Sequence, residues 1–328
     1  ASGDGSYTNP FVIGDAVEEP SGNSFDTVFA ANNTDIFPEN GLRYEGADPN
    51  NYICLDSNKE GACSSSSLLF RIIGLFDEDT SSNGTSSSGT KKLLKIIDTN
   101  NYGGTSGKNW DDGSLKNVKN SIGSREQYKI TLLAPLPGGY DTNNWSTASL
   151  KTELNGTYLT VLLGTSNVNS KLSSAIANAK WHLGGASESN YQTLTAERIY
   201  TEERNTSAIY SGNPSSIYAK VGLMYPSDYG YASDNCETKA LNDYNNSNDL
   251  RICNNTNWLF NLKKLEATIT QYSNTSTSIH YIADNGIVVS TYQASLAQTV
   301  VRPTLYLKSE VRIIDGDGTS TNPYTFGL

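Results

Sequence analysis

The chain has 328 residues, a net charge of −10 and 18% charged residues. A nucleic-acid binder would carry basic patches, and the adjacent lysines are limited to residues 91–92 and 263–264, so we expect no nucleic-acid partner. No stretch approaches the roughly 18 apolar residues of a membrane span, and no signal peptide is visible, which suits a mature or trimmed chain.

Turn-forming residues dominate the first fifty positions. No linker along the chain is long enough to separate independent domains. We therefore predict an N-terminal extension over residues 1–42, with a turn and a strand, and a single α+β domain over residues 43–328.

The four cysteines form two local couples. Cys54 and Cys63 are nine residues apart, and Cys236 and Cys253 are seventeen apart. Four cysteines allow three pairings, and we favour these two local ones because each would close a polar loop. Free buried thiols and a metal site are the alternatives, although no Cys-x-x-Cys is present. Disulfides imply an oxidising compartment, so we expect a secreted or cell-surface protein.

Apolar runs at residues 68–76 and 91–97 predict a β-hairpin around a Ser/Gly-rich tip at residues 80–90. Residues 128–133 are a further candidate strand. Between these strands and the C-terminal part, three stretches have helical character, at residues 146–161, 168–181 and 193–203. In the second, Leu172, Ala175, Ile176 and Ala179 follow helical spacing.

Tyrosine outnumbers phenylalanine 20 to 8, which suits hydrogen-bonding surfaces on a β scaffold. Residues 219–232 predict a strand that ends in an aromatic turn. Exposed aromatic rings suit stacking on sugars, so the tyrosines of this turn are the first candidates for a binding patch. The full set of candidate ligand-binding residues is Tyr225, Tyr229, Tyr231, Tyr272, Tyr281 and Tyr292.

The C-terminal sixty residues carry strong strand signals. An Asp-Asn-Gly turn at residues 284–286 separates two β-rich runs and predicts a hairpin. Arg302 and Pro303 lead into a strand that ends near residue 307; we assign both a structural role and expect Arg302 to pair internally. Structural, core positions are also predicted for Trp181 and Trp258, as for Trp110 and Trp145.

The tail repeats the beginning of the chain. Residues 2–14 and 315–327 align without gaps at Gly-Asp-Gly, at Thr-Asn-Pro and at the final Gly. We read each copy as a turn leading into a strand, and we predict self-association through these terminal segments. Asp315, Asp317 and Thr319 alternate as in a calcium loop, but the loop's sixth-position Gly and twelfth-position Glu are missing. We therefore favour a Gly-rich turn and predict no metal and no cofactor.

His182 and His280 are the two histidines of the chain. His182 is expected at a helix end, where a cation suits the helix dipole, and His280 in a strand. No triad motif such as Gly-x-Ser-x-Gly occurs, so we favour packing roles for both and predict that the protein is not an enzyme.

Several motifs over roughly residues 43–327 resemble, as a set, a large group of Firmicute and Mollicute-like surface proteins. They are Phe70-Arg-Ile-Ile-Gly-Leu-Phe76, Asn144-Trp-Ser-x-x-Ser-Leu150, Leu154-Asn-Gly-Thr-Tyr158, Ile176-Ala-Asn-Ala-Lys-Trp-His-Leu-Gly-Gly185, Lys220-Val-Gly-Leu-Met-Tyr-Pro-Ser-Asp-Tyr-Gly-Tyr-Ala232, Asn257-Trp-Leu and Val301-Arg-Pro-Thr-Leu-Tyr-Leu-Lys-Ser309.

The C-terminal half of that group is similar to the C-type-lectin-like fold shared by formylglycine-generating enzymes and retroelement-diversified variable proteins. The resemblance implies an α+β, C-type-lectin-like mixed fold with antiparallel β-hairpins, two or three helices and long loops. This chain departs from the group at Ala267, where a Trp is frequent, and at Val300, where a Gly is frequent.

We therefore expect an extracellular bacterial surface module, either adhesin-like or a fibre (pilus-like) subunit that assembles through its terminal segments. The alternative is a monomeric lectin-like receptor domain that binds a glycan or a host or cell-surface protein. An enzyme is the third and least favoured class.

Overall fold

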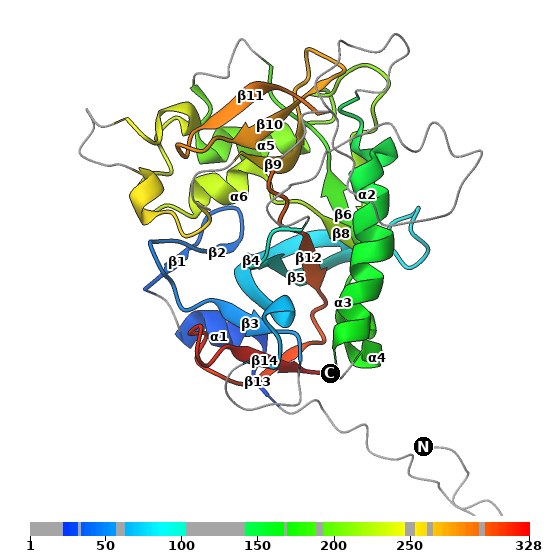
Figure 1. Cartoon of the computed structure of the whole chain (residues 1–328), viewed down its shortest axis with the longest axis vertical. Coiled ribbons are helices and arrows are strands. Elements are labelled where there is room, and N and C mark those ends of the chain that lie inside the picture. Colours follow the sequence, from blue (N-terminus) through cyan, green and yellow to red (C-terminus); the bar gives the residue numbers. More distant parts are fainter. Residues whose placement is uncertain are drawn as a thin grey trace, which may run out of the picture.

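The protein has an α+β fold built mainly from β-sheet, seen here in a computed structural model (Figure 1). The structure describes residues 22–31, 34–56, 63–102, 142–166, 169–187, 193–246, 253–260, 265–294 and 299–328. Within them, the strands form an 11-stranded sheet and a three-stranded sheet. The candidate strand at residues 128–133, the first copy of the repeat and Trp110 lie outside the described residues.

The centre of the large sheet is the predicted hairpin. Strands β4 (Leu69–Thr80) and β5 (Gly89–Asp98) pair antiparallel from Phe70↔Asp98 to Thr80↔Gly89, which confirms the sequence prediction. Buried apolar side chains lie between Phe70 and Phe76 on β4 and between Leu93 and Ile97 on β5, whereas residues 89–92 of β5 are exposed. At the tip, the side chain of Asn83 accepts hydrogen bonds from two backbone N–H groups, as Asx turns do.

The order of the main path is β13-β14-β3-β4-β5-β12-β8, and β14 is parallel to β3. The last strand of the chain is therefore an interior strand of the sheet. The bounds are β3 (Tyr52–Cys54), β8 (Val221–Gly222), β12 (Thr304–Leu307), β13 (Arg312–Asp315) and β14 (Tyr324–Gly327).

Four short strands attach to this path. β1 (Ile36–Phe37) pairs with β2 (Leu42–Tyr44), and β2 pairs with β4. β6 (Ala179–His182) pairs with β7 (Ser216–Ala219) and touches β4 at Thr80. Asn23, just before helix α1 (Phe25–Ala31), exchanges two backbone hydrogen bonds with Ile313 on β13. Residues of the predicted N-terminal extension thus pack on the sheet.

One helix prediction is wrong in its second half. α4 (Asn169–Ala175) ends early, and residues 179–181, which the sequence pattern assigned to the same helix, belong to strand β6. The reason is a tertiary contact, because Ala179 to His182 pair with β7 along their whole length. Trp181 is fully buried there, and its Nε1–H donates to the carbonyl of Ala219 at 3.0 Å.

The other two predicted helices are present. Residues 149–165 are continuously helical and include one π turn, and Thr195 caps the next helix by accepting from the N–H of Arg198. The segments are α2 (Ser149–Glu153), the π turn η5 (Leu154–Tyr158), α3 (Leu159–Thr165), α5 (Ala196–Arg204), α6 (Pro226–Tyr231) and the 3-10 turns η1 (Ser66–Leu68), η4 (Trp145–Thr147), η7 (Leu241–Asp243) and η8 (Cys253–Thr256).

The small sheet has the order β11-β10-β9 and is antiparallel. Its strands are β9 (Glu266–Gln271), β10 (Ser278–Ile282) and β11 (Val288–Gln293), and the predicted turn at residues 284–286 joins the last two. Gly286 adopts a φ of +83°, which a glycine tolerates without strain. Figure 1 shows this sheet beside α5 and α6, at the end of the molecule opposite β13 and β14.

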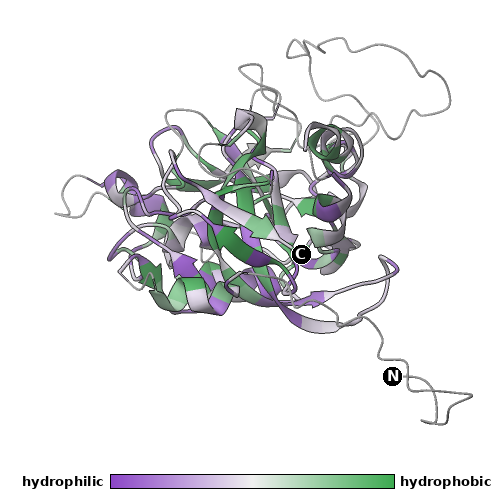
Figure 2. Cartoon of the chain, turned by 90° about the horizontal axis from the view of Figure 1, so that it is seen from below, coloured by the Kyte–Doolittle hydropathy of each residue, from purple (hydrophilic) through white to green (hydrophobic). Residues whose placement is uncertain are grey.

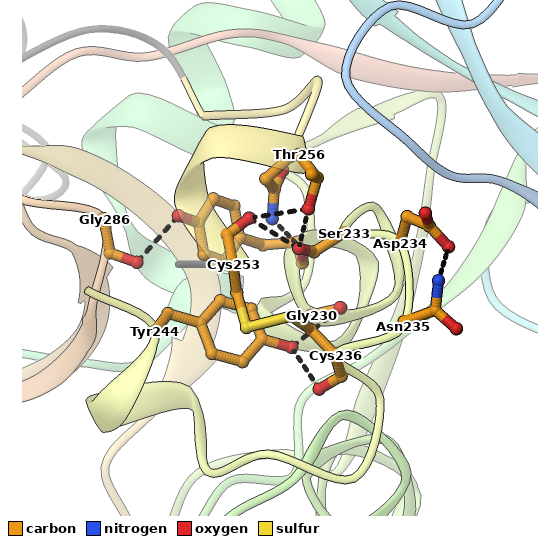
Figure 3. The surroundings of a disulfide bond; sticks show 11 residues. Gly230, Ser233, Asp234, Asn235, Cys236, Tyr244, Cys253, Thr256 and Gly286 are labelled. Atoms are coloured by element: carbon orange, nitrogen blue, oxygen red, sulfur yellow. Dashed lines mark hydrogen bonds between the residues drawn. A yellow bond between two sulfur atoms is a disulfide. The ribbon is translucent and has the colours of Figure 1, made fainter. Parts of the chain in front are cut away.

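Apolar residues gather in the strands at the middle of the molecule, and hydrophilic residues lie mostly towards its periphery (Figure 2). Both predicted disulfides form, between Cys54 and Cys63 and between Cys236 and Cys253. The second lies beside Tyr244, whose hydroxyl donates to the carbonyls of Gly230 and Cys236 (Figure 3). Of the helices described, none has the length and apolar character needed to cross a membrane.

Candidate functional site

The tyrosines predicted to form an exposed patch lie in the interior. Tyr225 precedes α6, and Tyr229 and Tyr231 are on it, with exposed fractions of 1% or less. Each hydroxyl has a fixed partner: Tyr225 accepts from the N–H of His182, Tyr229 donates to the carbonyl of Gly286, and Tyr231 donates to Glu39. The prediction of an exposed patch is therefore wrong, since buried hydroxyls that find partners let tyrosine act as a core residue.

The remaining candidate tyrosines belong to or adjoin the small sheet. Tyr272 and Tyr281 are buried, so neither ring is exposed for stacking on a sugar. Tyr292 lies on β11, where its backbone is opposite Ile279.

What α6 does provide is a buried carboxylate, Asp228, with three donors. Its Oδ1 accepts from the guanidinium of Arg43 at 3.0 Å, and its Oδ2 accepts from Lys95 Nζ at 2.5 Å. The backbone N–H of Tyr225 donates to Oδ2 at 2.8 Å, at the start of α6. The three charged side chains are each 2% exposed or less, and they come from β2, β5 and α6. We call this set the ion triad.

Aromatic rings surround the two cations of the ion triad. Lys95 Nζ lies 4.1 Å from the ring centroid of Tyr225 and 5.4 Å from those of Trp181 and Tyr306. The Arg43 guanidinium lies 4.5 Å from Phe76 and 4.6 Å from Tyr231. Cation–π contacts of this kind partly replace the lost hydration of a buried cation.

The charges shift one another's pKa values. Burial raises the pKa of Asp228, but Lys95 and Arg43 outweigh it and the net pKa is lowered. Burial lowers the pKa of Lys95, and the carboxylate of Asp228 only partly opposes this.

Two further acids lie close to the ion triad. Glu78 on β4 binds Arg204 at 2.8 Å and His182 Nε2 at 3.2 Å, and these partners outweigh burial and lower its pKa. Glu203 on α5 accepts from the N–H and the hydroxyl of Ser227, and burial raises its pKa to about 7. The prediction for His182 needs correction, because it ends strand β6 rather than a helix and pairs with Glu78.

Arg302 has the internal partner that the sequence led us to expect. Its Nε and one terminal nitrogen donate to the two oxygens of Glu266 at 2.6 and 2.9 Å, and that nitrogen also donates to the carbonyl of Leu259 at 2.6 Å. Pro303 accepts from the N–H of Asp98. Burial raises the pKa of Asp98 to about 6. These contacts give Arg302 and Pro303 structural roles.

The other predicted structural residues also lie in the interior. Trp258 is 6% exposed and donates to the carbonyl of Tyr44. His280 is fully buried on β10, and burial lowers its pKa to about 4, so its ring is neutral at pH 7. Asp317 closes the predicted Gly-rich turn, because its side chain accepts from both the N–H and the hydroxyl of Thr319.

One cavity of about 360 Å³ opens beside the ion triad. Two of its lining rings, Phe76 and Tyr200, also contact Arg43 at 4.5 and 5.5 Å. Polar groups of Asn40, Asp77 and Lys92 line its rim, and Gly41, Leu42 and Leu75 complete it. This volume is at the small end of ligand pockets, and rings with nearby amide and charged groups suit a polar ligand with an apolar face.

The sequence signals of the ion triad are weak. Lys95 interrupts the apolar run at residues 93–97, and Asp228 lies between two tyrosines, yet their separation of 133 residues hides the contact. Among the described residues, no group of three His, Cys, Asp or Glu side chains is placed to hold a metal ion. Comparisons with family models, with curated proteins and with solved structures found no match to this chain.

Proposed function

We propose that this protein is an extracellular bacterial surface module with a C-type-lectin-like fold, and that it assembles as an adhesin-like or fibre subunit through its repeated terminal segments. The two disulfides suit a secreted protein. The lectin-like classification is supported by the sequence motifs and by the mixed architecture with its second, smaller sheet.

The observation that carries the assembly proposal is the way the second copy of the repeat fits the sheet. β14 inserts between β3 and β13, and Tyr324 and Phe326 point into the core at 7% and 0% exposure. The turn before it needs two glycines at positive φ. A Cβ on Gly316 would lie 2.2 Å from the carbonyl oxygen of Pro323, and one on Gly318 would lie 2.3 Å from that of Asn50.

The first copy of the repeat keeps every feature that this fit requires. Gly3 and Gly5 align with the two glycines of the turn, and Asp4 aligns with Asp317. Phe11 and Ile13 align with Tyr324 and Phe326, so the apolar side chains fall on the same positions of the strand. Exchange of matching elements between subunits is a common route to assembly, and strand addition supplies its affinity through backbone hydrogen bonds.

We therefore infer that the first copy of one molecule takes the place of β14 in the next. The test compares two aromatic-to-aspartate variants of the full chain. Phe11→Asp places a charge at the position of the buried Tyr324, whereas Tyr7→Asp changes the position that aligns with the exposed Ser320. Sedimentation velocity and electron microscopy should show concentration-dependent oligomers for the wild type and for Tyr7→Asp, and monomers for Phe11→Asp. A wild-type protein that stays monomeric at high concentration contradicts the proposal.

The cavity favours a second candidate function, a monomeric lectin-like domain that binds a glycan. Tyr200 supplies a half-buried ring, and Asn40 and Asp77 supply hydrogen-bonding groups beside it. A glycan array with the wild type, with Tyr200→Ala and with Tyr210→Ala as a control outside the cavity tests this. Binding that Tyr200→Ala abolishes and Tyr210→Ala keeps supports the lectin; an array without hits, with and without calcium, rejects it.

A further inference from the structure

Lys95 has an environment that suits an ammonium ion poorly. The residue lies on β5, between β4 and β12, and its side chain is 1% exposed. An ammonium group has three N–H donors. Among the described residues, the one oxygen that accepts from Nζ is Oδ2 of Asp228, at 2.5 Å. The nearest rings, of Tyr225, Trp181 and Tyr306, lie 4.1 to 5.4 Å away.

Asp228 presents its carboxyl group to this amine in a fixed orientation. Oδ2 is held by Lys95 and by the N–H of Tyr225, and Oδ1 is held by the guanidinium of Arg43. A donor already placed on the oxygen that gains negative charge lowers the barrier of acyl transfer. Arg43 is so placed for an attack of the amine on the carboxyl carbon of Asp228.

We propose that the folded protein joins Lys95 and Asp228 through an intramolecular amide bond. One proton first passes from the ammonium group to Oδ2, which leaves Nζ with a lone pair. Nζ then attacks Cγ, the Nζ–Cγ bond forms, and the Cγ–Oδ2 bond breaks. Nζ gives up two of the three protons of the ammonium form, and Oδ2 leaves with them as water. The ion pair therefore contains every atom that the reaction needs, and no oxidant, cofactor or net proton is involved. Oδ1 becomes the carbonyl oxygen and keeps its hydrogen bond from Arg43.

The surroundings favour this reaction in three ways. The amide replaces the buried ammonium–carboxylate pair of Lys95 and Asp228 by a neutral group with a single N–H to satisfy, and Arg43 keeps its hydrogen bond to Oδ1. Holding two reacting groups in contact can be equivalent to an effective concentration of about 10⁵ M or more. The near-complete burial of both side chains keeps bulk water from the amide and so disfavours hydrolysis.

The test is the mass of the full-length wild-type protein, denatured and with its cysteines reduced. We expect the protein to be lighter than its sequence mass by one water molecule. A tryptic digest should contain a branched peptide that joins the segment around Lys95 to the segment around Asp228, without cleavage after Lys95.

Two controls separate the amide from other losses of water. Lys95→Met keeps the Asp-Gly sequences, which can lose water by cyclisation, but has no amine, so it should have the full sequence mass. The exposed pair Lys92–Asp26, at 2.9 Å in the same molecule, should be recovered as unlinked peptides. A wild-type protein at full mass, with the Lys95 and Asp228 peptides recovered separately, overturns the proposal, and so does a water loss that Lys95→Met retains.

Discussion

Replacing Arg302 with methionine removes a guanidinium from a carboxylate that has almost no access to water. Glu266 is 2% exposed, and both of its oxygens accept from Arg302. Methionine keeps much of the length and apolar surface of the arginine stem, so the substitution acts mainly on the charge. It also removes the donor to the carbonyl of Leu259.

The loss of stability comes from the Glu266 carboxylate, which stays buried after its partner is removed. Removing one partner of a buried ion pair typically destabilises a protein by about 3–5 kcal/mol, because the other charge stays buried without compensation. Glu266 can avoid this by taking up a proton. Burial already raises its pKa, and Arg302 opposes that rise. In Arg302→Met the folded protein therefore binds a proton more tightly than the unfolded chain, and stability falls as the pH rises.

We expect Arg302→Met to lower the free energy of unfolding by about 3–5 kcal/mol at pH 8. The loss should shrink by up to about 1.4 kcal/mol for each pH unit over which Glu266 becomes protonated. Urea denaturation followed by tyrosine and tryptophan fluorescence at pH 8 and pH 5 measures both effects. Adding Glu266→Gln to the variant should recover part of the loss and remove its pH dependence.

The matched control is Lys92→Met. Lys92 pairs with Asp26 on the surface, where the side chains are 47% and 58% exposed, and such pairs contribute at most about 1 kcal/mol. If Arg302→Met costs no more than Lys92→Met, or if its cost is the same at both pH values, the buried pair does not have the role described.

Three further predictions concern stability. Burial raises the pKa of Glu203 from 4.5 to about 7. The free energy of unfolding should therefore fall by roughly 3 kcal/mol as the pH rises from about 4.5 through 7. Glu203→Gln should flatten the pH dependence of the melting temperature, and an unchanged slope would contradict this. Gly185→Ala should cost about 2–3 kcal/mol in urea denaturation, since its Cβ would lie 1.8 Å from the carbonyl oxygen of Gln271, whereas Gly164→Ala, with open space around it, should be neutral or stabilising; equal effects would refute the steric argument. Replacing Cys236 and Cys253 by serine should lower the free energy of unfolding by about 2–4 kcal/mol in urea denaturation. A reductant breaks both disulfides, so if Cys236–Cys253 contributes most of the stabilisation, the reduced wild type should lose the same amount of stability as the serine variant.

Sequence periodicity predicted the elements whose contacts are local. The β4–β5 hairpin combines two apolar runs with a Ser/Gly-rich tip, and the hairpin at residues 284–286 combines two apolar runs with a short turn, so each element carries its own signal. The two disulfides are local in the same sense, with separations of 9 and 17 residues. The predicted helix is wrong at its C-terminal end because Ala and Lys favour a helix, whereas pairing with β7 makes Ala179 to His182 a strand.

The interior polar contacts were harder to predict because their partners are distant in sequence. Arg302 was expected to pair, yet nothing in the chain singles out Glu266 among the acidic residues. Asp228 joins Arg43 over a separation of 185 residues and Lys95 over 133. The tyrosine-rich composition suggested that the tyrosines of α6 are exposed, because composition does not reveal that Gly286 and Glu39 accept hydrogen bonds from the hydroxyls inside the protein.

The assembly proposal and the amide proposal can be tested independently, because they involve different residues. Phe11→Asp changes a segment that plays no part in the ion triad, so it should abolish oligomers and leave the protein mass at its lowered value. Lys95→Met changes a residue at the centre of the sheet, three strands away from β14, so it should restore the full mass and leave oligomers intact. If Lys95→Met also abolished assembly, the exchange of the β14 position would depend on the rigidity of β5, which is connected to β14 through β4 and β3.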